Sequence, residues 1–122
     1  MMNIKPTESE LEILQVLWNK GNCTVRDVHE ELTKTKDAGY TTTLKLMQIM
    51  HDKGLVTRDS SAKTHIYQAA FSEQQAQKTA LDKIITTVFK GSAAELVMQA
   101  LGNHKASKDE IDAIKDYLKK FE

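Results

Sequence analysis

Apolar residues return every three or four positions in two stretches near the start of the chain, which is the spacing of one helix face. The first stretch has an apolar face made of Leu11, Leu14, Leu17 and Trp18. The second has Val25, Val28 and Leu32. Thr7 and Glu10 stand before the first face with the spacing of a capping box, and Gly21 follows it as a stop signal. A second helix is predicted to begin at Thr24, with Asp27 in the reciprocal capping position.

A third helix is predicted in "YTTTLKLMQIMHDKG", with Thr41 as its N-cap and Gly54 as its stop. Its inward face is expected to hold Leu44, Met47 and Met50. The opposite, outward face is expected to hold Thr41, Lys45, Gln48 and Asp52, flanked by Thr42 and Ile49. The row of threonines at the head of this helix is expected to leave its hydroxyl groups exposed.

Two short strand-like segments follow, "GLVTR" and "THIYQAA", joined by the polar "DSSAK". A hairpin of this kind places Arg58 on a strand and Lys63 near the tip. Three helices followed by a hairpin is the order of a winged helix-turn-helix, in which the third helix enters the DNA major groove. The predicted fold class is therefore mainly α with a small β-hairpin wing.

Three amphipathic helices are predicted after the hairpin, with capping boxes at Ser72 and Gln75 and at Ser107 and Glu110. The pattern divides the chain into a winged-helix DNA-binding domain, residues 1–71, and a helical region, residues 72–122. The apolar positions of that region are Leu81, Ile84, Ile85, Val88, Phe89, Leu96, Val97, Leu101, Ile111, Ile114 and Leu118. A second copy of the chain is the simplest partner for them, so they are the predicted dimerisation surface. The alternative is that they fold back on the first domain.

The 122-residue chain has 17 basic and 17 acidic residues and a net charge of zero, so only the distribution of its charges is informative. Residues 1–32 carry three more acidic than basic residues, and residues 33–70 carry three more basic than acidic ones. Neutrality argues against indiscriminate binding to nucleic acid, and a local basic excess suits a sequence-selective binder. A single cysteine, no signal peptide and no apolar run of about 20 residues indicate a cytoplasmic protein with no membrane partner.

The chain has no sequence feature of an enzyme. It contains no glycine-rich phosphate loop and no nucleophile-elbow motif. Its four histidines lack the paired spacing of metal ligands, so neither a metal nor a cofactor is predicted. Cys23 is interpreted as a packed thiol, and Met47, Met50 and Met98 as core residues.

The outward face of the third helix suits duplex DNA. Threonine hydroxyls and helix N-terminal amides hold phosphates. Gln48 suits a bidentate contact to adenine, Lys45 suits guanine or phosphate, and Ile49 or a threonine methyl suits the methyl group of thymine. The alternative from composition alone is an ordinary solvated helix face with capping threonines.

Three segments, "TESELEILQVLW", "YTTTLKLMQIMHDKGLVTRD" and "HIYQA", resemble the BlaI/MecI family of bacterial repressors, the penicillinase repressors, over essentially the whole chain. The resemblance implies a dimeric winged-helix repressor that binds a dyad operator in double-stranded DNA and dimerises through its C-terminal helices. By motif, the recognition helix contains Thr41, Thr42, Thr43, Lys45 and Gln48, and the wing contains Arg58 and Lys63.

The chain also departs from that family. Members often have arginine where Ile49 stands. Antibiotic-linked members are cut at an Asn-Phe bond, and the matching region here is near Gln99 and Ala100, a different dipeptide. A regulatory protease is therefore a candidate partner that the residues themselves do not favour. The cysteine-rich tail of the copper-responsive relatives is absent.

The function predicted from the sequence is a dimeric, sequence-specific DNA-binding repressor. Two alternatives stay open: a winged-helix module that docks on a partner protein, and a ligand-sensing repressor.

Overall fold

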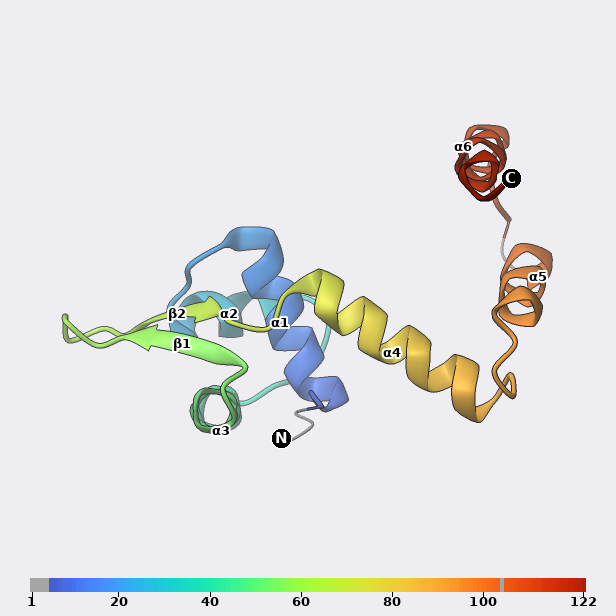
Figure 1. The fold of residues 1–122 in the computed structure, drawn as a ribbon. Coiled ribbons are helices and arrows are strands. Elements are labelled where there is room, and N and C mark those ends of the chain that lie inside the picture. Colours follow the sequence, from blue (N-terminus) through green and yellow to red (C-terminus); the bar gives the residue numbers. More distant parts are fainter. Residues whose placement is uncertain (1–4, 104) are drawn as a thin grey trace. The chain divides into compact units, whose positions relative to one another are not determined.

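A computed structural model describes residues 5–103 and 105–122, and Figure 1 shows its fold. The first part contains α1 (Glu8–Lys20), α2 (Val25–Leu32), α3 (Tyr40–Lys53), β1 (Val56–Asp59) and β2 (Ile66–Ala69). The second part contains α4 (Glu73–Thr87), α5 (Ala93–Asn103), α6 (Lys108–Leu118) and the 3-10 turn η1 (Lys119–Phe121). The predicted winged helix-turn-helix order is confirmed.

The chain divides into two compact units, and the division lies between Lys78 and Thr79. That point is inside α4, whereas the sequence suggested a boundary between residues 71 and 72. The first turns of α4 therefore belong to the winged-helix unit.

Reciprocal side-chain caps start the first two helices, as predicted. Thr7 Oγ1 accepts from the Glu10 amide at 3.2 Å, and Glu10 Oε1 accepts from the Thr7 amide at 2.8 Å. Thr24 and Asp27 form the same pair of bonds at the start of α2, both 3.1 Å long. Each box satisfies amides that a helix start leaves without an intrahelical partner.

The start of α3 differs from the prediction. The helix begins at Tyr40, its N-cap is Gly39, and no side chain caps it. The expectation that Thr41 is the N-cap is therefore wrong. Gly54 ends the helix as predicted, in the left-handed conformation (φ 81°) that glycine adopts without strain.

The hairpin is antiparallel, with Arg58 opposite Tyr67 and Val56 opposite Ala69. Cys23 forms an isolated antiparallel bridge to β2: its amide donates to the Tyr67 carbonyl at 3.0 Å, and its carbonyl accepts from the Tyr67 amide at 2.7 Å. These bonds tie the loop between α1 and α2 to β2, and Tyr67 is only 1% exposed. The wing is thereby attached to the helical body at its base, while residues 60–65 extend beyond it as the tip.

One apolar core holds this unit together. Its buried members are Ile13, Leu14, Leu17, Cys23, Val25, Val28, Leu32, Met47, Met50, Leu55, Val56 and Tyr67. Trp18 packs against this cluster and donates its indole N–H to the Phe71 carbonyl at 2.9 Å. All of these residues precede α4, so the apolar core of the first unit is formed by residues of that unit alone.

The second unit has amphipathic helices without a buried residue among its described positions. The predicted capping box of Ser107 and Glu110 starts α6, and the predicted box of Ser72 and Gln75 starts α4 within the winged-helix unit. Met98 is 73% exposed, so its interpretation as a core residue is wrong. In the described residues, no helix has the length and apolar character needed to cross a membrane.

Candidate nucleic-acid interface

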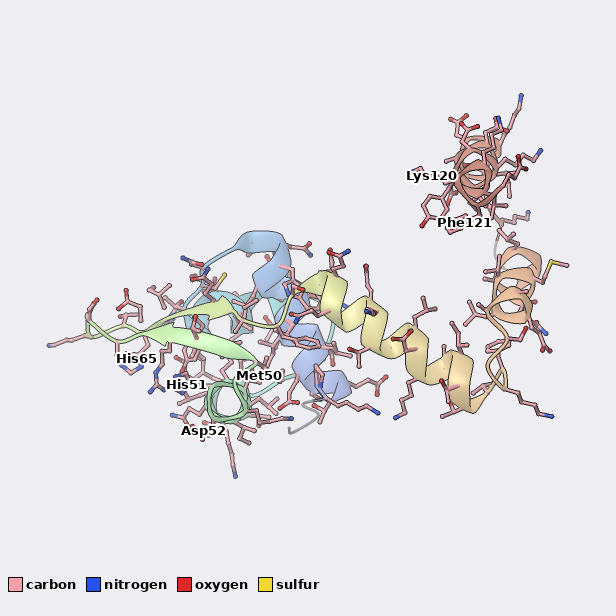
Figure 2. The ribbon with its side chains drawn as sticks, in the orientation of Figure 1. Met50, His51, Asp52, His65, Lys120 and Phe121 are labelled. Carbon is pink, nitrogen blue, oxygen red and sulfur yellow. The ribbon has the colours of Figure 1, made fainter. Side chains whose placement is uncertain are left out.

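The outward face of α3 is polar and exposed. Thr41, Thr42, Lys45, Gln48 and Asp52 are all exposed, and Ile49 lies among them at 39% exposure. Met47 and Met50 are fully buried on the opposite side. Figure 2 shows Met50 and Asp52 pointing to opposite sides of the helix. The absence of a side-chain cap leaves the first-turn amides of α3 for another acceptor.

Thr43 departs from the expected row of exposed threonines, because it is 0% exposed. Its hydroxyl donates to the Gly39 carbonyl at 3.3 Å, and His29 Nδ1 lies 3.3 Å from the Thr43 hydroxyl oxygen. The His29 ring also packs edge-on against Tyr40, with 5.4 Å between ring centroids. Thr43 therefore joins the head of α3 to α2, and its hydroxyl cannot reach DNA.

An open groove of about 600 Å³ lies between the start of α2, α3 and the wing. Its lining consists of Thr24, Val25, Arg26, Tyr40, Leu44, Gln48, Arg58, Lys63, Thr64, His65 and Tyr67. Three of these side chains are permanently cationic and none is a carboxylate. The groove thus brings Gln48, Arg58 and Lys63 together, as the sequence predicted for the recognition helix and wing. It also adds Arg26, which the sequence reasoning missed.

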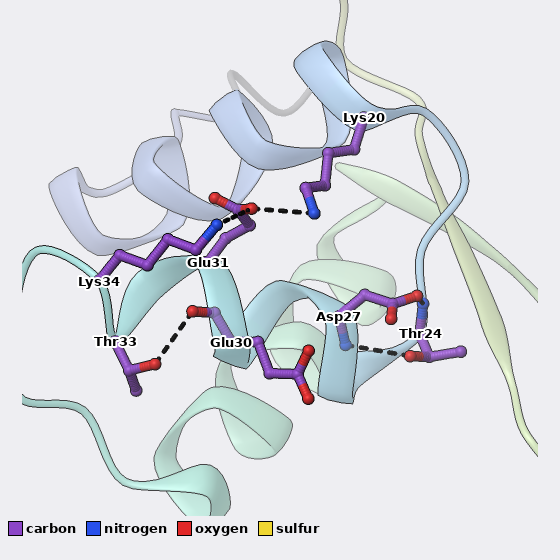
Figure 3. Close-up of polar contacts among 7 residues, drawn as sticks. All are labelled: Lys20, Thr24, Asp27, Glu30, Glu31, Thr33 and Lys34. Carbon is purple, nitrogen blue, oxygen red and sulfur yellow. Dashed lines mark hydrogen bonds and ion pairs between the residues drawn. The ribbon is translucent and has the colours of Figure 1, made fainter.

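Several lysines of this unit that lie outside the groove are held in ion pairs. Lys20 and Lys34 both contact Glu31 Oε1, at 2.9 and 2.8 Å (Figure 3), and Lys36 contacts Glu12 at 3.1 Å. Hydrogen bonds from Lys34 and Lys20 lower the pKa of Glu31 to about 2. Glu31 is therefore ionised at neutral pH and engages both lysines.

The cations of the groove and of the outward face of α3 are different. Arg26, Lys45, Arg58 and Lys63 form no ion pair with any residue in the described part of the chain. The Nε atom of Arg58 is buried and has no hydrogen-bond partner among those residues. A buried donor without an acceptor is unfavourable, and a bound water or a shift of the side chain toward an acceptor relieves that cost. This face can therefore take an anion without first breaking an internal pair.

A buried ion pair anchors the other end of α3. Lys53 Nζ lies 2.7 Å from Glu10 Oε1, and the Glu10 side chain is only 2% exposed. Burial raises the pKa of Glu10, but hydrogen bonds from Lys53 and Thr7 outweigh it, and the pKa is below its usual value. Glu10 thus stays ionised and ties the C-terminal turn of α3 to the first turn of α1.

The predicted dimerisation residues are spread over the faces of α4, α5 and α6. The most exposed are Val88 at 65% and Leu118 at 55%. Leu81, Ile84, Val97 and Leu101 are also exposed, and Ile85, Phe89, Leu96, Ile111 and Ile114 are half-buried. Tyr117 and Phe121, which the predicted set omitted, are 56% and 72% exposed. Gln99 and Ala100 are exposed on α5.

Comparisons with known proteins agree with this geometry. The sequence profile of the penicillinase repressor family matches residues 6–120. The methicillin resistance regulatory protein MecI of Staphylococcus aureus is 25% identical over 114 residues, 93% of each chain. The penicillinase repressor of Bacillus licheniformis is 20% identical over 112 residues, 92% of this chain and 88% of its own. A MarR family protein from Bacillus stearothermophilus has a similar fold, with a TM-score of 0.52 and 22% identity over 98% of this chain and 74% of that one.

Proposed function

The chain belongs to the penicillinase repressor family, and we propose that it acts in the cytoplasm as a homodimer on a two-fold symmetric operator. Membership of this family makes the chain a DNA-binding transcriptional repressor and not an enzyme. The resemblance seen in the sequence is thereby confirmed at the level of the family. The symmetric operator, the dimer and the residue assignments are the proposal.

The observation that carries this proposal is the carboxylate-free groove, in which Arg26, Arg58 and Lys63 meet Gln48 of α3. In the proposed complex α3 enters the major groove, and Lys45 and Gln48 contact base edges. The groove cations and the exposed hydroxyls of α3 hold the flanking phosphates.

The burial of each threonine at the start of α3 decides whether its hydroxyl is proposed to contact DNA. Thr41 and Thr42 are exposed in the first turn of α3, where hydroxyls and free amides together suit a phosphate. Thr43 is removed from the contact set because its hydroxyl is buried and bonded to Gly39. It positions α3 against α2 instead.

Dimerisation is supported by the apolar surface of the second unit. Its exposed side chains include Val88, Val97, Met98, Leu101 and Leu118. Several exposed large apolar side chains on consecutive amphipathic helices favour an interface, and a second copy of the chain is always present at the same concentration. A dimer also doubles the number of base contacts that one recognition helix makes. This doubling allows specific binding by a chain whose net charge is zero.

The protein-docking alternative finds little support in the first unit. Among its described residues, the exposed large apolar side chains are Tyr40 and Ile49 alone, too few for a standard protein interface. Nor does the proposal include a regulatory protease, since Gln99 and Ala100 stand where the resembled repressors have Asn-Phe.

The test is selection of bound sequences from a random duplex library with the full-length protein at near-physiological salt. A two-fold symmetric site with half-sites roughly 34 Å apart is expected. Lys45→Ala with Gln48→Ala is expected to abolish enrichment while the protein stays folded and dimeric. Lys34→Ala is the matched control, because Lys34 is paired with Glu31 outside the groove. Failure of the folded dimer to enrich any site would refute the proposal.

A further inference from the structure

An isoleucine lies in the middle of the polar face of α3. Ile49 is 39% exposed, and its neighbours three, four and seven residues away on that side include the exposed polar Thr42, Lys45 and Asp52. Its one apolar neighbour at this spacing, Leu46, is half-buried against the core, so Ile49 is the single exposed large apolar side chain in this part of α3.

Position on the helix distinguishes Ile49 from Tyr40, the other exposed large apolar residue of the unit. Tyr40 is in the first turn, packs on His29 and lines the groove. Ile49 does not line the groove and comes one residue after Gln48, whose amide is proposed to contact a base. Ile49 lies four residues after Lys45 and so shares its side of the helix, and Lys45 is also proposed to contact a base edge.

We propose that Ile49 is a specificity-determining residue that contacts the C5 methyl group of a thymine in each operator half-site, an inference that rests on the proposed function. The thymine methyl is the only apolar group that a base pair presents in the major groove. An aliphatic side chain on the reading face has no hydrogen-bonding role, so its favourable contact there is with that methyl. The operator half-site accordingly contains a thymine that deoxyuridine cannot replace without loss.

The experiment replaces each thymine of the selected operator in turn by deoxyuridine, which lacks the methyl and keeps the hydrogen-bonding edge. Affinities of the full-length protein are measured by fluorescence anisotropy. Loss of one buried methyl corresponds to about a fourfold loss of affinity. Symmetric replacement in two distant half-sites is expected to weaken binding about 15-fold, since such effects add. In Ile49→Ala this replacement is expected to change affinity by less than about twofold.

Thr42→Ser is the matched control, because it removes a methyl from a neighbouring exposed side chain and keeps the hydroxyl. It is expected to leave the deoxyuridine effect unchanged. If the effect disappears in Thr42→Ser and persists in Ile49→Ala, the assignment to Ile49 is overturned. The same holds if no thymine position couples to Ile49 although the wild-type protein selects an operator. If no operator is selected at all, the proposed function falls together with this inference.

Discussion

The ion pair between Glu10 and Lys53 leads to a stability prediction with a definite sign. Replacing Lys53 by Met keeps the aliphatic stem of the side chain and removes the ammonium group 2.7 Å from a carboxylate that is 2% exposed. Breaking a buried pair by removing one partner costs about 3–5 kcal/mol. Since 32% of the Lys53 side chain is exposed, water already weakens the pair, and we expect a loss of about 2–3 kcal/mol.

The converse replacement is expected to cost less. Glu10→Gln leaves an amide oxygen that still accepts the Thr7 amide, and the unpaired Lys53 can extend into water. We expect the unfolding free energy of Glu10→Gln to fall by about 1 kcal/mol, because charged hydrogen bonds to the carboxylate are replaced by neutral ones to the amide. The asymmetry between the two variants follows from burial, because only the carboxylate is fully removed from solvent.

The effect of Lys53→Met is also expected to depend on pH. In the wild type the pKa of Glu10 lies below its usual 4.5, so the pair stabilises the fold above pH 4.5 and this contribution is lost as pH falls through the lowered value. In the variant, burial without Lys53 is expected to raise that pKa, so the deficit disappears as the carboxyl is protonated. The difference in unfolding free energy is therefore largest near pH 7 and shrinks toward pH 4.

Urea unfolding followed by tryptophan fluorescence measures this directly. Trp18 is the single tryptophan and lies in the first unit, with its indole bonded to Phe71. A difference between wild type and Lys53→Met that stays constant from pH 7 to pH 4 would refute the reasoning. So would a larger loss in Glu10→Gln than in Lys53→Met.

Three further predictions concern the interface and the second unit. Lys63→Ala removes one phosphate contact from each protomer and is expected to reduce the slope of log K against log salt for the operator by about 1.8. The ion-paired Lys34→Ala is expected to leave that slope unchanged, and anisotropy titrations at several salt concentrations measure both. Thr43→Val is expected to lower the unfolding free energy by about 1–2 kcal/mol in urea, with the selected operator sequence unaltered. Val88→Glu is expected to reduce the dimer fraction in sedimentation velocity and operator affinity with it, and an unchanged dimer would exclude Val88 from the interface.

Much of the first unit could be predicted because its signals are local. Capping boxes at Thr7 and Thr24 act within four residues, and the alternation of apolar positions marks the core face of each helix. The burial of Thr43 was predictable in the same way, since it is four residues before Met47 and seven before Met50 on one helical line. The neighbouring exposed threonines obscured that signal.

The start of α3 and the role of Arg26 could not be predicted from local signals. Threonine is typical of N-caps, yet Gly39 takes that position because the Thr43 hydroxyl bonds back to its carbonyl while contacting His29 of α2. Arg26 belongs to a segment with an acidic excess. Its role depends on the wing, which is 30 or more residues away in sequence and is brought to α2 by the bonds between Cys23 and Tyr67.

A chain of zero net charge presents a cationic face when its basic and acidic residues lie on different parts of the surface. Glu10, Glu12 and Glu31 bind lysines that do not line the groove, and hydrogen bonds keep Glu31 ionised down to a pKa of about 2. The remaining cations of α2, α3 and the wing then meet no carboxylate in the groove. In the proposed complex, long-range attraction to DNA is weak because the whole chain is neutral, so binding depends on short-range contacts made once α3 enters the major groove. We therefore expect the protein to discriminate between sequences, because little of its affinity is then independent of the bases it contacts.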